Sequence, residues 1–168
     1  ILTELGYSLQ IADIALPVDT EVDQGVIDRL QQSYYELLPK VTINSESAKR
    51  EFLIAPLLYE VIRTADVKLQ VEYPINVDDR LSGLIDYLLR AKQELVIVEA
   101  KRGDLERGFT QLAAELIAID KSENPDLPQT IYGAITIGEV WRFAYLDRST
   151  KTIAKSVHTF RFPEDVGE

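Results

Sequence analysis

Residues 82–101 of the chain read SGLIDYLLRAKQELVIVEAK, two apolar runs on either side of the short segment 91–93. Strands in the middle of a sheet are covered on both faces, so short and uniformly apolar runs are typical of them. The stretch therefore predicts a β-hairpin, with strands over residues 82–90 and 94–101.

The turn of this hairpin decides which residues face one another. If it is centred between Lys92 and Gln93, the numbers of paired residues sum to 185, and Asp86 faces Glu99. Directly opposed side chains have Cβ atoms roughly 5 Å apart, and like charges there are destabilising. Both acids also lie in apolar runs, where an unpaired charge is costly to bury. A cation between them would remove both problems, and ligands that are all oxygen favour Mg²⁺, with Mn²⁺ as a substitute.

Lys101 belongs to the same group of polar residues. Alternation along the strand puts Glu99 and Lys101 on one side, and Val98 and Ala100 on the other. The Lys101 ammonium could hold a scissile phosphate or the attacking water, and the backbone carbonyl of Ala100 is a candidate for a further metal ligand. The alternative is that Glu99 and Lys101 form only a structural ion pair at the end of a strand.

The rest of the chain alternates between helical and strand patterns. Helices are predicted over residues 24–37, from Ser45 or Ser47 to Ile62 with a bend or junction at Pro56, and from the N-cap Asp104 to Ile119. Strands are predicted over residues 67–73, 131–137, 140–146 and 152–160. Helices, three strands, one helix and further strands in this order predict a single α/β domain over residues 1–168.

Two helices add polar residues that could serve the same site. Gln111 and Glu115 are four residues apart and share a helix face, so Gln111 could orient water or substrate, whereas Glu115 is more typical of a solvated surface. Glu51 follows Lys49 and Arg50 near a helix start and could contact a metal directly or through water. The competing interpretation of Glu51 is that it only stabilises the helix dipole.

An acid on one strand, a Glu-x-Lys on the next, a following helix with a Gln and a preceding helix with a Glu together resemble the PD-(D/E)XK nuclease superfamily. The resemblance covers roughly residues 47–146 and extends to stand-alone bacterial members whose substrates are unassigned. It implies a restriction-endonuclease-like mixed sheet flanked by helices, and Mg²⁺-dependent hydrolysis of phosphodiester bonds in nucleic acid, with DNA the expected substrate. It also implies a role for each matching residue: Asp86 and Glu99 as metal ligands, Lys101 as the catalytic lysine, and Glu51 and Gln111 as accessory residues. Ile85 stands where the motif has proline.

Composition narrows the possible functions. The chain has no cysteine, which excludes disulfides, thiolate metal sites and a cysteine nucleophile, and the cytoplasm is the expected compartment. No segment approaches the ~20 apolar residues of a membrane span, so no membrane contact is expected. The net charge of −10 argues against non-specific coating of nucleic acid. The basic residues near the C-terminus, Arg148, Lys151 and Lys155 among them, are instead predicted to contact nucleic acid on one face.

Other classes of function remain open beside the nuclease. The chain could be a nuclease-fold binding or assembly module without catalysis, and a homodimer is possible. A Ser-His-acid hydrolase is disfavoured, because His158 is the only histidine and no Gly-x-Ser-x-Gly sequence occurs.

Overall fold

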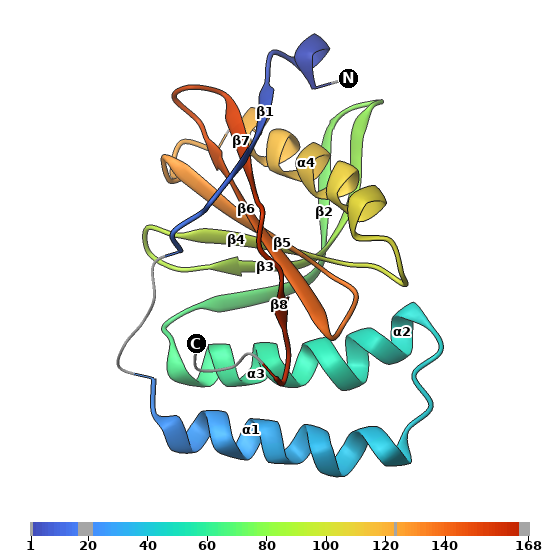
Figure 1. Cartoon of the computed structure of the whole chain (residues 1–168). Helices are drawn as coiled ribbons and strands as arrows, with labels where there is room; N and C mark the ends of the chain where they lie inside the picture. Colours follow the sequence, from blue (N-terminus) through green and yellow to red (C-terminus); the bar gives the residue numbers. More distant parts are fainter. Residues whose placement is uncertain (1, 17–21, 123, 165–168) are drawn as a thin grey trace.

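The computed structural model of the chain describes residues 2–16, 22–122 and 124–164. Within them, eight strands form one mixed sheet in the order β1-β7-β6-β5-β4-β3-β2, and β8 pairs with β6 (Figure 1). The strands are β1 (Ser8–Ala12), β2 (Lys68–Asp78), β3 (Leu81–Arg90), β4 (Leu95–Ala100), β5 (Thr130–Thr136), β6 (Val140–Asp147), β7 (Thr152–Ser156) and β8 (Phe160–Arg161). The α/β prediction is confirmed. Among these residues, no helix has the length and apolar character needed to cross a bilayer.

Helices cover both faces of the sheet. They are η1 (Thr3–Leu5), α1 (Gln24–Leu37), η2 (Leu38–Lys40), α2 (Glu46–Lys49), the π-helical η3 (Arg50–Ile54), α3 (Ala55–Thr64) and α4 (Leu105–Lys121). Figure 1 shows α4 on one side of the sheet and α1 with α3 on the other. Accordingly there are two apolar cores, one containing Ile97 and Leu112 and the other containing Val98 and Leu58.

The central hairpin has the predicted register. β3 and β4 pair as Tyr87↔Val98, Leu88↔Ile97, Leu89↔Val96 and Arg90↔Leu95, all of which sum to 185. The backbone N–H of Ala91 donates to the Glu94 carbonyl at 2.9 Å and closes the turn. β4 then pairs in parallel with β5, and α4 makes the crossover that a parallel pair requires.

The helical region after Ser45 is divided near Pro56. The Ser45 hydroxyl accepts a hydrogen bond from Ala48 N–H at 3.0 Å and so caps α2. Pro56 lies in the first turn of α3, immediately after the π-helical η3. Proline has no N–H to donate to the preceding turn, and a wider turn accommodates this defect. The predicted junction at Pro56 is thus confirmed.

The edges of the sheet differ from the predictions. β2 continues past the predicted end at Tyr73 to Asp78, and the predicted strand over residues 152–160 is divided into β7 and β8. β1 was not predicted. It is only five residues long and largely exposed, and its parallel pairing with β7 joins segments far apart in the chain. A strand of this kind carries little periodic signal.

Candidate active site

The candidate site lies where β3 and β4 separate. Their ladder ends at Tyr87↔Val98, one pair before Asp86 and Glu99. Beyond that point the two strands diverge and form a fork. The Asp86 carboxylate lies in this fork, where its Oδ2 accepts a hydrogen bond from the Ala100 N–H at 2.8 Å. β4 meanwhile stays paired to β5 through Glu99↔Ile135. The fork therefore brings the Asp86 carboxylate and the Ala100 backbone, two predicted site elements, into direct contact.

Arg50 supplies a positive charge to Asp86. Its guanidinium Nη1 lies 3.2 Å from Asp86 Oδ1 and 3.5 Å from Glu72 Oε1, and the guanidinium carbon lies 5.3 Å from the centre of the Tyr87 ring. Glu72 stands across from Asp86 in β2 with a φ of 54°, a left-handed conformation that is uncommon for a residue with a side chain. Such strain often occurs beside functional groups, and here it interrupts the β2–β3 ladder at Asp86.

Glu99 is the most unusual group of the site. Its residue is only 1% exposed, and Lys101 Nζ approaches Oε1 to 2.5 Å. The Lys101 ammonium therefore forms an ion pair with Oε1, whereas Oε2 has no such partner in the described part of the chain. Buried carboxylates are normally hydrogen-bonded, because an unsatisfied one costs several kcal/mol. Glu99 Oε2 therefore keeps acceptor capacity for a further partner.

Glu115 contributes a third carboxyl group. It is 7% exposed, and Gln111 Nε2 donates to its Oε1 at 3.1 Å. Burial, followed by the charge of Glu99, raises the pKa of Glu115 to about 9. Burial also raises the pKa of Glu99, to about 7, although the Lys101 ammonium opposes that shift. Burial and the Glu99 charge therefore favour the protonated form of Glu115, which can donate a hydrogen bond to Glu99.

The sequence had suggested a solvated surface for Glu115. The long β2–β3 hairpin rises beside α4 and covers this side chain, which is a contact between distant segments. The four-residue spacing from Gln111 could have indicated the burial of Glu115, because residues four apart lie on the same helix face and share its environment.

Lys101 is positioned by close packing against α4. A Cβ atom on Gly108 would lie 2.7 Å from Lys101 Cγ and 2.5 Å from Ile135 Cδ1, so only glycine lets the first turns of α4 approach this closely. The Lys101 N–H donates to the Thr136 carbonyl at 2.8 Å. Burial disfavours the ammonium charge, but the Glu99 carboxylate outweighs that effect and raises the pKa of Lys101. Lys101 is therefore charged, and it lies beside Glu99 as the strand alternation predicted.

Glu51 is not brought to this cluster. It is exposed and lines a separate hollow of about 340 Å³ with Arg50, Tyr59 and Glu72. Within the described residues it forms no hydrogen bond or ion pair with Asp86 or Glu99. The nearer acid from this helical region is the half-buried Glu46, whose charge helps to raise the pKa of Lys101. Glu46 directly follows the N-cap Ser45, which is also the pattern of a helix-dipole residue.

The donor set suits a hard divalent cation. Among residues 2–16, 22–122 and 124–164, no group of three or more His, Asp or Glu side chains is spaced to hold a metal ion. Mg²⁺, however, usually takes only one or two protein carboxylates and keeps several waters. Asp86, Glu99 and the Ala100 carbonyl would supply that number of oxygens, although Arg50 and Lys101 are paired with the two carboxylates in this structure.

No family model matches the chain, and no curated protein matches it. Any function of the chain must therefore be inferred from the arrangement of Asp86, Glu99, Lys101, Gln111 and Glu115.

The basic residues near the C-terminus are engaged within the molecule. Arg148 Nε and Lys151 Nζ lie 2.7 Å and 2.6 Å from the Asp120 carboxylate. Lys155 is 7% exposed and contacts the Glu106 carboxylate. These three cations already have intramolecular partners, which does not favour the predicted nucleic-acid contacts at this end of the chain.

Proposed function

We propose that this chain is a metal-dependent nuclease with a restriction-endonuclease-like fold, and that it hydrolyses phosphodiester bonds in nucleic acid, with DNA the expected substrate. The observation that carries the proposal is the buried Glu99 carboxylate, which pairs with Lys101 and lies close enough to Asp86 for their charges to interact. The arrangement of an acid on β3, a Glu-x-Lys at the end of β4 and a following crossover helix supports the same fold.

Each residue then has a role that its position supports. Asp86, Glu99 and the Ala100 carbonyl would hold Mg²⁺ or Mn²⁺, and the bound ion would neutralise phosphate charge and lower the pKa of a water. Lys101 carries a positive charge beside Glu99 and would stabilise negative charge on the phosphate. Gln111, on the adjoining helix face, would donate its amide to a water or phosphate oxygen.

A second candidate is a nuclease-fold binding or assembly module without catalysis. The ion pairs of Arg50 with Asp86 and of Lys101 with Glu99 favour it, because the two carboxylates receive positive charge from the chain itself. The two candidates differ in what a metal ion does to the protein.

Thermal unfolding with and without Mn²⁺ tests the metal site. A ligand that binds only the folded state raises the melting temperature, so millimolar Mn²⁺ should raise it in the wild type. Asp86→Asn should remove most of this rise, whereas Glu94→Gln in the exposed hairpin turn should leave it unchanged. A wild-type melting temperature that does not respond to Mn²⁺ would favour the binding module.

Nicking of single-stranded and duplex DNA tests catalysis. Lys101→Ala should lower Mn²⁺-dependent nicking by roughly 100–1000-fold, the usual cost of removing one charge-stabilising donor. Lys92→Ala, which removes an exposed lysine from the same hairpin, is the matched control and should nick at the wild-type rate. Undiminished nicking by Lys101→Ala would show that Lys101 is not catalytic, and the absence of nicking by the wild type would count against the nuclease.

A further inference from the structure

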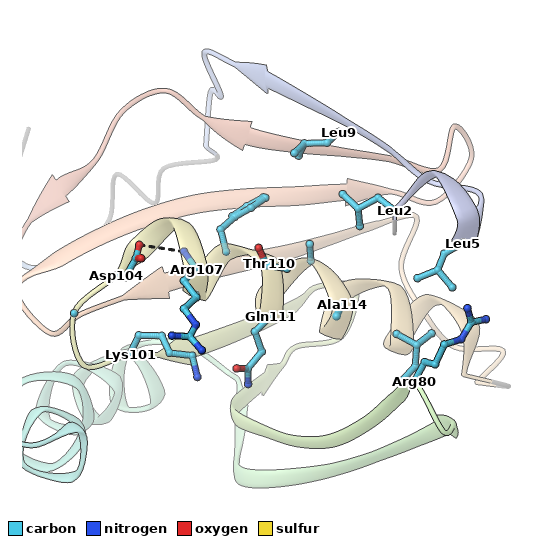
Figure 2. Close-up of a pocket in the computed structure, with 15 residues that line it drawn as sticks. Leu2, Leu5, Leu9, Arg80, Lys101, Asp104, Arg107, Thr110, Gln111 and Ala114 are labelled. Carbon is cyan, nitrogen blue, oxygen red and sulfur yellow. Dashed lines mark hydrogen bonds between the residues drawn. The ribbon is translucent and has the colours of Figure 1, made fainter.

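A hollow of about 830 Å³ adjoins the candidate site along α4 (Figure 2). It shares Lys101 and Gln111 with that site. One wall is the N-terminal segment with Leu2, Leu5 and Leu9, and the far end is formed by Arg80 in the β2–β3 turn. A pocket of this size accommodates a small ligand or a short stretch of a polymer.

The charged groups around the hollow are mainly cationic. Arg107 and Arg80 line it together with Lys101, and neither arginine forms a salt bridge with any residue that the structure describes. Asp104 is the one acid among the lining residues, and its carboxylate accepts the N–H groups of Glu106 and Arg107 at 2.9 and 3.1 Å. Exposed guanidinium groups beside a hollow would attract an anionic ligand even in a chain of net charge −10.

One face of α4 lies between the cations at the two ends of the hollow. Arg107, Gln111 and Ala114 follow one another at intervals of four and three residues, which places them on one face of α4. In Figure 2 Arg107 extends beside Lys101, and Arg80 lies at the opposite end beyond Ala114. From Arg107 to Ala114 the helix rises by roughly 10 Å, about three nucleotides of a stacked strand. The two arginines can thus hold phosphates on either side of Gln111.

The leucine wall suits unpaired bases. Leu9 is 45% exposed at the hollow, while Phe109 is 5% exposed and has the Lys155 ammonium over its ring. The apolar surface open to a ligand is therefore aliphatic, and burying the faces of unstacked bases against it is favourable. A duplex keeps its bases stacked and paired and could not use a wall of this kind.

We propose that this hollow binds two or three nucleotides of an unpaired nucleic-acid strand, with phosphates on Arg107 and Arg80 and bases against the leucines. This inference names the substrate class of the proposed nuclease. It rests on that function only for cleavage of the bound strand beside Lys101. Binding itself requires no cleavage. The inference specifically predicts that the protein prefers an unpaired strand to a duplex.

The test is binding of a fluorescently labelled 12-nucleotide DNA, single-stranded or annealed to its complement, measured by anisotropy in EDTA. The wild type should bind the single strand at least tenfold more tightly than the duplex. Arg107→Glu and Arg80→Glu should each weaken single-strand binding about five- to twentyfold, and should reduce the slope of log affinity against log salt by about 0.7 per lost phosphate contact. Leu9→Ser should weaken binding without changing that slope.

Arg29→Glu is the matched control, because it reverses an exposed charge on α1, across the sheet from α4. It should bind like the wild type, and circular dichroism should show all four variants folded. Binding by Arg107→Glu and Arg80→Glu equal to that of Arg29→Glu, a preference for duplex, or no binding of the single strand would overturn the inference.

The same measurements separate this inference from the proposed function. Single-strand binding that depends on Arg107 and Arg80, in a protein that never nicks DNA in Mn²⁺, would support the binding groove and reject the nuclease. Nicking of single strands at the wild-type rate by both arginine variants would support the nuclease and reject the groove.

Discussion

At the scale of single residues, the site concentrates carboxyl groups where water is scarce. Glu99 and Glu115 are both buried; the charge of Glu99 raises the pKa of Glu115, whereas a hydrogen bond with Glu115 lowers the pKa of Glu99. A buried pair of this kind shares protons, so one member remains neutral near neutral pH.

Glu115→Gln should change how stability depends on pH. Folding raises the pKa of Glu115 from 4.5 to about 9, so its contribution is fully present below pH 4.5 and is lost as pH rises toward 9. The amide cannot ionise and keeps the shape of the side chain. We therefore expect a flatter stability profile between about pH 5 and 9, and a free energy of unfolding about 1–3 kcal/mol higher at about pH 8.

Urea unfolding monitored by circular dichroism across this pH range measures the effect. Glu94→Gln, an exposed substitution in the hairpin turn, should reproduce the wild-type profile. Parallel profiles for Glu115→Gln and the wild type would mean that Glu115 is ionised in the folded protein.

At the scale of elements, α4 organises the site. Its N-cap Asp104 sets where the helix begins, Gly108 brings it against Lys101, and Gln111 with Glu115 directs polar groups toward the fork of β3 and β4. A glycine inside a helix is unfavourable by about 1 kcal/mol relative to alanine, so its presence at 108 is explained by packing rather than by helix propensity.

Gly108→Ala should destabilise the protein although alanine is the better helix former. The added Cβ would meet the fully buried Ile135 and the Lys101 stem, and overpacking of this kind costs about 1–3 kcal/mol. Because the Lys101 side chain must move, Mn²⁺-dependent nicking should fall as well. Thermal unfolding and nicking are compared with Gly103→Ala, where a Cβ meets nothing within 4 Å. A Gly108→Ala protein as stable and active as Gly103→Ala would contradict this account of the packing.

At the scale of the whole molecule, an acidic residue near each end of α4 forms ion pairs with cations from distant segments. The side chain of Asp120 is fully buried and binds Tyr7, Arg148 and Lys151, so one carboxylate connects the N-terminal segment, α4 and the β6–β7 turn. At the other end, Glu106 contacts Arg142 and Lys155. These cations therefore contribute to the stability of the fold.

Asp120→Ala should lower the free energy of unfolding by about 2–4 kcal/mol, because three donors lose a buried, charged acceptor. Burial opposes ionisation of Asp120, but the contacts with Lys151, Tyr7 and Arg148 outweigh it and lower its pKa. The wild type should therefore lose this stability as pH falls below 3.8, and the variant should not. Asp66→Ala, in an exposed loop, is the control. Equal unfolding free energies for the two variants would show that the Asp120 contacts do not stabilise the fold.

The sequence by itself determined the features that depend on neighbouring residues. Periodicity and capping predicted α1 and most of α4. The hairpin turn predicted the register of β3 and β4 up to Tyr87↔Val98, next to Asp86 and Glu99, and strand alternation put Glu99 on the side of Lys101. Information of this kind is contained in a few consecutive residues, since turn geometry and side-chain alternation follow from local backbone conformation.

Tertiary structure alone decided the environment of the same residues. The burial of Glu115, the placement of Arg50 rather than Glu51 on Asp86, and the capture of Arg148 by Asp120 each join segments well separated in sequence. Burial and charge pairing depend on which distant elements pack together, and no local pattern encodes that choice. The chemical character of the site, with two buried carboxyl groups of raised pKa beside a lysine, therefore arises only when α4 and the β2–β3 hairpin close over the end of β4.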